Sequence, residues 1–148
     1  MILYVGYGFN VEDLTEQQLI DFIRCSPYAK DFEEYLKDAD AEEDDVVTEF
    51  MEERSGYVSY FVSCAINAAE RKRAKDRGCD LGSEDVVVAY DTFVFFDSLR
   101  FAEEDKRSQI IRTEEDFLRM LKRYFHELPT IGNILAGTEF MDVAFWME

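Results

Sequence analysis

Residues 86–96 read VVVAYDTFVFF, which is the strongest strand signal in the chain and decides its fold class. β-branched and aromatic side chains fill this stretch almost throughout, as is typical of a β-strand. Both faces of such a strand are mostly apolar, so we predict a central strand that is covered on two sides. A central strand needs partners on both edges, and three other stretches of the chain favour extended structure.

The three shorter strands are predicted from residues near both ends and from one internal segment. Residues 2–7 read ILYVGY, and we expect Gly6 and Gly8 to form a turn directly after them. Two more strands are expected near residues 109–112 and 139–147. The sheet that these strands would form is small and mostly antiparallel.

Helical periodicity follows the first strand. Thr15 or Asp13 is placed to cap a helix over residues 15–24. A second helix is expected after Pro27. Its apolar positions fall at helical spacing and form one stripe, made of Tyr28, Phe32, Tyr35 and Leu36.

Two more helices complete the predicted fold. A long helix is expected over about residues 45–76, with a possible kink at Ser55-Gly56. A last helix opens at Thr113 and ends at Pro129. With about four helices packed on a small sheet, residues 1–148 are predicted to form a single α+β domain.

Negative charge is concentrated in residues 31–53, which read DFEEYLKDADAEEDDVVTEFMEE. This segment holds twelve carboxylates and one basic residue, Lys37, and so carries −11 of the formal net charge of −17. Such a surface repels nucleic acid and anionic membranes, and it attracts cations or a basic protein surface. Hydrophobic residues make up 47% of the chain and aromatic residues 15%, which is too apolar for a disordered acidic tail.

The cysteines and the N-terminal sequence indicate a cytoplasmic protein. Cys25, Cys64 and Cys79 are odd in number and have no CxxC spacing, and His126 is the single histidine, so neither a disulfide scaffold nor a zinc site is expected. The first residues have no basic segment followed by an apolar one, so no signal peptide is expected. The apolar runs are far shorter than the roughly 20 residues that span a bilayer.

Taken together, the small size, strong negative charge, many aromatics and lack of a catalytic set are similar to a class of acidic anti-defence proteins. These are the anti-CRISPR and anti-restriction DNA mimics of phages and mobile elements. The resemblance is one of class, so it assigns no role to an individual residue. It implies an inhibitor that acts stoichiometrically, without enzymatic activity or a cofactor, on the nucleic-acid-binding channel of a defence nuclease or effector.

The predicted binding residues come from the acidic segment itself. Carboxylates on helices repeat every roughly 5 to 6 Å, close to the roughly 7 Å between phosphates on a DNA strand. The carboxylates expected to contact a basic, nucleic-acid-binding partner are Asp38, Asp40, Glu42, Glu43, Asp44, Asp45, Glu49, Glu52 and Glu53. Exposed tyrosines beside them would anchor the complex, and the candidates are Tyr28, Tyr35 and Tyr57.

Two other functions remain open from the sequence. The first is a cytoplasmic immunity or regulatory protein that binds one basic partner without mimicking nucleic acid. The second is a metal-dependent enzyme that uses Asp91 and Asp142, two acids inside apolar strands that could be neighbours in the sheet. Two further patterns do not match the binding motifs that they resemble: DADAEEDD at 38–45 lacks the glycine of a calcium loop, and VGYGFN at 5–10 lacks the third glycine of a dinucleotide fingerprint. The basic run RKRAKDR at 71–77 suits the C-terminal end of a helix.

Overall fold

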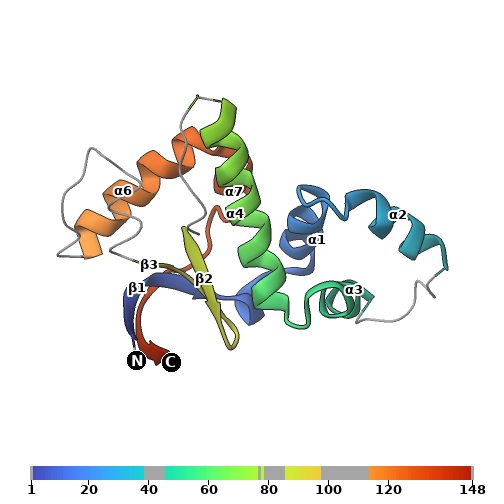
Figure 1. Cartoon of the computed structure of the whole chain (residues 1–148), viewed down its shortest axis with the longest axis horizontal. Helices are drawn as coiled ribbons and strands as arrows, with labels where there is room; N and C mark the ends of the chain where they lie inside the picture. Colours follow the sequence, from blue (N-terminus) through green and yellow to red (C-terminus); the bar gives the residue numbers. More distant parts are fainter. Residues whose placement is uncertain (1, 39–45, 77, 79–85, 98–113, 148) are drawn as a thin grey trace.

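The fold was analysed in a computed structural model that describes residues 2–38, 46–76, 78, 86–97 and 114–147. Figure 1 shows how the helices and strands are arranged. In chain order the elements are β1 (Ile2–Asn10), the 3-10 helix η1 (Val11–Asp13), α1 (Glu16–Arg24), α2 (Ala29–Asp38), α3 (Val46–Ser55), α4 (Val58–Asp76), β2 (Val87–Tyr90), β3 (Phe93–Asp97), α6 (Glu114–Glu127), α7 (Pro129–Ile134) and β4 (Met141–Met147).

The four described strands form one antiparallel sheet in the order β2-β3-β1-β4. The last strand pairs along its whole length with residues 2–8 of β1, so Ile2 lies opposite Met147 and the two ends of the chain lie side by side (Figure 1). The predicted class, an α+β domain with a small antiparallel sheet, is therefore confirmed. The strand predicted near residues 109–112 lies outside the described residues.

The prediction of a single central strand over residues 86–96 is wrong, because this stretch forms a β-hairpin. Tyr90 pairs with Phe93, and Asp91 and Thr92 make the turn between β2 and β3. Asp91 has a φ of 53°, and aspartate is one of the few non-glycine residues that tolerates this left-handed conformation. Eleven residues also exceed the usual strand length of roughly five to six, which is a reason to expect a reversal within the stretch.

The first strand is longer than predicted, and its glycines do not form a turn. Gly6 and Gly8 lie inside β1, opposite Asp97 and Phe95 of β3. A Cβ atom on either glycine would overlap the backbone of β3, and the Phe95 side chain lies against both positions. Glycine is therefore required here because the backbones of β1 and β3 approach closely, and not because the chain changes direction.

The long helix predicted over residues 45–76 is two helices, α3 and α4. Gly56 has a φ of 82° and its N–H donates to the carbonyl of Glu52 at 2.7 Å, which ends α3 instead of kinking a continuous helix. Pro129, which was expected to end the last helix, is also the first residue of α7. The described residues thus contain six α-helices rather than about four, while Thr15 does cap α1 as predicted, in a capping box with Gln18.

Aromatic side chains make much of the core between the sheet and α6. Tyr7 of β1 stacks on Phe117 of α6 with ring centroids 4.3 Å apart. Phe96 of β3 packs edge-on against Tyr124, with centroids 5.6 Å apart. Aromatic pairs of this kind add about 0.5–1.5 kcal/mol beyond the area they bury, so they fix α6 on the sheet.

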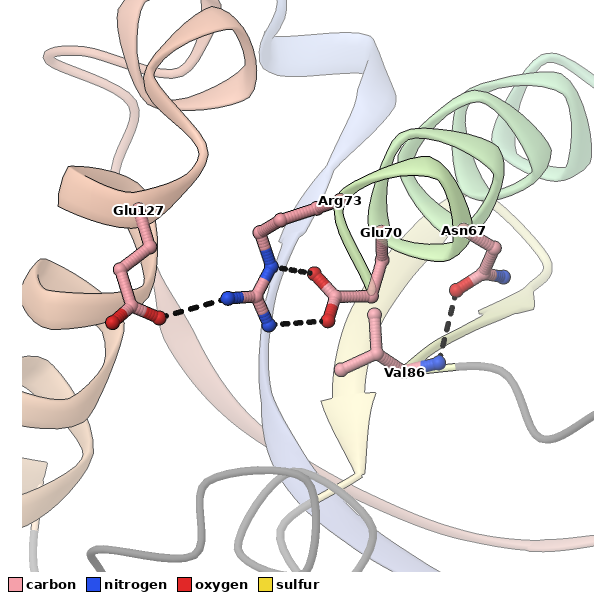
Figure 2. Close-up of polar contacts among 5 residues, drawn as sticks. All are labelled: Asn67, Glu70, Arg73, Val86 and Glu127. Atoms are coloured by element: carbon pink, nitrogen blue, oxygen red, sulfur yellow. Dashed lines mark hydrogen bonds and ion pairs between the residues drawn. The ribbon is translucent and has the colours of Figure 1, made fainter. Parts of the chain in front are cut away.

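The α4 helix is joined to the sheet edge and to α6 by buried polar groups (Figure 2). The Asn67 side-chain amide accepts from the N–H groups of Val86 and Val87 at 2.9 and 3.0 Å, and donates to the Val87 carbonyl at 3.1 Å. Arg73 forms a bidentate ion pair with Glu70 and reaches Glu127 of α6 at 2.9 Å. The Glu70 carboxylate raises the pKa of Arg73 above its usual value, and this triad links two helices in the interior.

Candidate partner-binding surface

The α2 helix carries its carboxylates on the outside because its apolar stripe points inward. Phe32 is fully buried and Tyr35 is half-buried, and both pack on Phe50 of α3 with ring centroids 5.0 and 5.2 Å apart. The acidic residues of this helix are all exposed, namely Asp31, Glu33, Glu34 and Asp38. Leu36, the last member of the predicted stripe, is exposed as well.

The α3 helix presents a second set of exposed carboxylates, Glu49, Glu52 and Glu53. Its inward side is apolar, with Val46, Val47, Phe50 and Met51 buried. We refer to the seven exposed carboxylates of both helices as the acidic surface: Asp31, Glu33, Glu34, Asp38, Glu49, Glu52 and Glu53. In Figure 1 the two helices form one end of the molecule, away from the sheet and α6.

Few basic groups of the described chain neutralise the acidic surface. Arg24 lies 3.9 Å from Glu33, and both side chains are more than half exposed. Arg54 lies 3.4 Å from Glu53 and places its guanidinium over the Phe50 ring, 4.4 Å from the centroid. Within the described residues, these are the two ion pairs that involve the acidic surface, and exposed pairs of this type contribute little stability.

Four of the nine predicted binding carboxylates, Asp38, Glu49, Glu52 and Glu53, are therefore exposed on α2 and α3. The other five come from the connector between these helices and lie outside the described residues: Asp40, Glu42, Glu43, Asp44 and Asp45.

The structure distinguishes among the three candidate tyrosines. Tyr57, between α3 and α4, is 72% exposed. Tyr28 and Tyr35 are instead packed against the hydrophobic core. Tyr60, which the sequence analysis did not single out, is 53% exposed on the first turns of α4. Tyr57 and Tyr60 are thus exposed aromatic residues at the α3–α4 junction, and they follow the carboxylates of α3 closely in the chain.

A cavity of about 330 Å³ lies at this same junction. It is lined by residues from η1, α1, α3, the α3–α4 junction, α4 and the β2–β3 turn. Three carboxylates line it, those of Glu12, Glu52 and Asp91. No local motif predicts this cavity, because its residues are brought together only by the packing of the turn against the helices.

The alternative site built on Asp91 and Asp142 is not assembled, because the neighbouring strands that it requires are not neighbours in the sheet. Asp142 of β4 lies opposite Tyr7 of β1, whereas the turn at Asp91 and Thr92 bonds to Val11 beyond the far end of β1. The strand β1 separates β4 from β3, and the two positions differ by roughly 13 Å along the sheet. Both aspartates are exposed, and within the described residues no three His, Cys, Asp or Glu side chains are placed so that they could hold a metal ion together.

The basic run at the end of α4 is only partly a surface feature. Arg71, Lys72 and Lys75 are exposed, but Arg73 is the inward-facing member that binds Glu70 and Glu127. His126 is exposed on α6. The run therefore serves partly to join α4 to α6 rather than to present a continuous basic patch.

Two of the three cysteines are described, and both are free thiols. Cys25 is half-buried at the end of α1, and burial raises its pKa to about 11. A thiol with a raised pKa holds little thiolate near neutral pH, so Cys25 is unsuited to nucleophilic chemistry.

Comparison of the chain with protein-family models, with curated proteins and with solved structures gives no match. Among the described residues, none of the helices has the length and apolar character needed to cross a membrane. The acidic surface, the exposed tyrosines and the cavity are therefore the features of the described chain that point to a function.

Proposed function

We propose that this protein is a stoichiometric inhibitor that binds the basic, nucleic-acid-binding surface of a defence nuclease or effector in the cytoplasm. The observation that carries the proposal is the placement of seven exposed carboxylates on two adjacent helices, beside the exposed side chain of Tyr57. Proteins that bind DNA grip a regular array of phosphates with lysine and arginine. An array of carboxylates fixed on a folded scaffold offers similar charge to the same groups.

Charge alone gives fast association, and the neighbouring aromatic groups supply the short-range part of binding. Opposite charges raise association rates, and this effect weakens as salt screens them. Interface energy is carried mainly by a few anchors such as tyrosine. Tyr57 and Tyr60 lie close to α3 in the chain and expose enough ring surface to act as such anchors.

The first experiment is capture of partners from a bacterial lysate with tagged protein, at low and high salt and with or without duplex DNA. Mimicry predicts a basic nucleic-acid-binding protein that DNA displaces and that high salt releases. A bound protein that DNA does not displace would instead favour an immunity or regulatory role. The captured protein is then purified, and its nucleic-acid binding or cleavage is titrated with the inhibitor to test for loss of activity at equimolar amounts.

A charge-matched pair of variants tests whether the acidic surface itself makes the contact. The test variant neutralises described carboxylates of the predicted site: Asp38→Asn, Glu49→Gln, Glu52→Gln and Glu53→Gln. The control variant removes the same charge from exposed positions elsewhere: Asp76→Asn, Glu115→Gln, Glu139→Gln and Asp142→Asn. We expect the first variant to lose inhibition and the second to retain most of it. Equal activity of the two variants would show that net charge, and not this surface, is responsible.

The acidic connector is tested separately because it lies outside the described residues. Neutralising Asp40, Glu42, Glu43, Asp44 and Asp45 together is expected to abolish inhibition without unfolding the protein. Full inhibition by both this variant and the test variant on α2 and α3 would contradict the mimicry proposal.

A further inference from the structure

The cavity at the α3–α4 junction differs from the rest of the acidic surface because it is concave and built from several elements. Its volume of about 330 Å³ lies at the lower end of the range for small-molecule sites, so it suits one side chain better than a large ligand. Glu52 belongs both to the acidic surface and to the cavity lining. The cavity is thus continuous with the surface proposed to meet the partner.

Three carboxylates set the charge of the cavity. Glu12 comes from η1, Glu52 from α3 and Asp91 from the β2–β3 turn, and the residues that line the cavity include no lysine, arginine or histidine. Arg54, on the same helix as Glu52, places its guanidinium over Phe50 and beside Glu53 instead. The described lining therefore carries a formal charge of −3 without an internal counter-ion.

The rest of the lining combines apolar and aromatic residues with three hydroxyl residues, Thr48, Ser59 and Thr92. Val11, Leu19 and Val58 contribute aliphatic surface, and Tyr57 contributes an aromatic ring at the exposed rim. A ligand that fits must therefore combine a positive group with an apolar stem. A hydrated inorganic cation does not use the apolar part of this lining.

The elements that carry the carboxylates are held in place by hydrogen bonds. The buried Ser59 hydroxyl donates to the carbonyl of Asp91, and the Val11 N–H donates to the carbonyl of Thr92 at 2.8 Å. The turn is thereby joined to α4 and to the end of β1. Because the backbone is fixed before a ligand arrives, little ordering is needed on binding.

Helix dipoles do not reverse the sign of this site. The C-terminal end of α3, which favours cations, and the N-terminal end of α4, which favours anions, both meet the cavity. These two effects oppose each other at short range. The three carboxylates therefore decide which charge is accepted.

We infer that the cavity binds an arginine side chain of the basic partner, an inference that rests on the proposed function. A guanidinium is planar and has five N–H donors, so it pairs with carboxylates from different directions at once. Its flat face stacks on an aromatic ring such as Tyr57, and its methylene stem suits the aliphatic lining. A lysine ammonium is a compact, strongly hydrated charge that uses less of this geometry.

The test is a titration of the full-length, isotope-labelled protein with N-acetyl-arginine-amide, followed by amide NMR shifts. We expect saturable shifts at Gly56, Tyr57 and Thr92, with weaker binding of the lysine analogue and none of the neutral glutamine analogue. The double variant Glu52→Gln with Asp91→Asn should bind the arginine probe about fivefold to tenfold more weakly. Asparagine is chosen at position 91 because it tolerates the positive φ of that residue.

A matched variant, Glu115→Gln with Asp142→Asn, removes the same charge from exposed positions outside the acidic surface and leaves the cavity lining intact. It should bind the probe nearly as the wild type does. Absence of saturable shifts in the folded wild type, equal shifts with the glutamine analogue, or equal weakening in both variants would overturn the arginine site. If only the arginine site is wrong, partner capture and inhibition persist although the probe does not bind as expected. If the proposed function is wrong, no partner is captured although the cavity still binds the probe.

Discussion

The buried Asn67 side chain gives the sharpest test of how the hairpin is held on α4. It lies in the middle of a helix, is only 4% exposed, and makes three hydrogen bonds to the backbone at the start of β2. β2 is an edge strand of the described sheet, so these backbone groups have no neighbouring strand on that side. We predict that Asn67→Ala strongly destabilises the protein.

The size of the effect follows from the number of groups left without a partner. Two N–H groups and one carbonyl lose their hydrogen bonds, and an unsatisfied buried group costs about 1–3 kcal/mol. Taking the lower value for each, because water enters the space left by the amide, the expected loss in free energy of unfolding is about 3 kcal/mol. This is a large share of the roughly 5–15 kcal/mol that stabilises a typical domain.

Urea unfolding followed by circular dichroism measures this loss. With a denaturant dependence of about 2 kcal/mol per molar urea, the midpoint should fall by about 1.5 M. Asn133→Ala, at an exposed position on α7, is the control and should change stability by less than about 0.5 kcal/mol. If Asn67→Ala lowers the free energy of unfolding by less than about 1 kcal/mol, its hydrogen bonds to Val86 and Val87 do not stabilise the position of β2 as proposed.

Three further perturbations test other parts of the fold. Arg73→Ala leaves the buried Glu70 without its bidentate partner and should lower the free energy of unfolding by about 3–5 kcal/mol in the same urea assay. Replacing both residues, with Glu70→Leu and Arg73→Met, should cost much less, and equal losses for the two variants would contradict a buried ion pair. Gly8→Ala forces a Cβ into the backbone at Val94 and should lower stability by about 3 kcal/mol or more, so a wild-type melting temperature would contradict the close approach. Alkylation of Cys25 by iodoacetamide at pH 8, followed by mass spectrometry, should be about tenfold slower than in the urea-unfolded chain, because burial raises the pKa of this thiol to about 11. The fraction of thiolate is then about a hundredfold lower, but a thiolate of higher pKa is more nucleophilic, which offsets part of this loss. Its rate should climb until the pH nears 11, and equal folded and unfolded rates would contradict the burial of the thiol.

Local signals predicted those parts of the fold that depend on neighbouring residues. The cap at Thr15, one of the two residues predicted to cap α1, follows from a hydroxyl placed just before a helical segment, and the inward stripe of α2 follows from helical spacing around Phe32. The strand near the C-terminus follows from its apolar residues, and its observed bounds are Met141–Met147. The α+β class follows because these signals come in separate helical and extended segments.

Local signals failed where the same residues can form either of two conformations and only contacts with distant residues favour one of them. The hairpin at Asp91 was read as one strand because both of its arms are apolar and its turn contains neither glycine nor proline. Asn67 was missed as well, although an amide inside the apolar stretch VSYFVSCAINAA is itself a sign of a buried hydrogen-bonding role.

Composition and residue periods of two to four are enough to give the fold class, the excess of carboxylates on α2 and α3, and the polar outer faces of these helices. The exposure of Tyr57 beside these acids, and the partial burial of Tyr28 and Tyr35 against the core, depend on how the helices pack. The tertiary structure also places Glu12, Glu52 and Asp91 around one cavity, while Asp142 lies apart. The physical reason is that proximity between distant residues comes from strand order and helix packing, and no local pattern of side chains encodes either one.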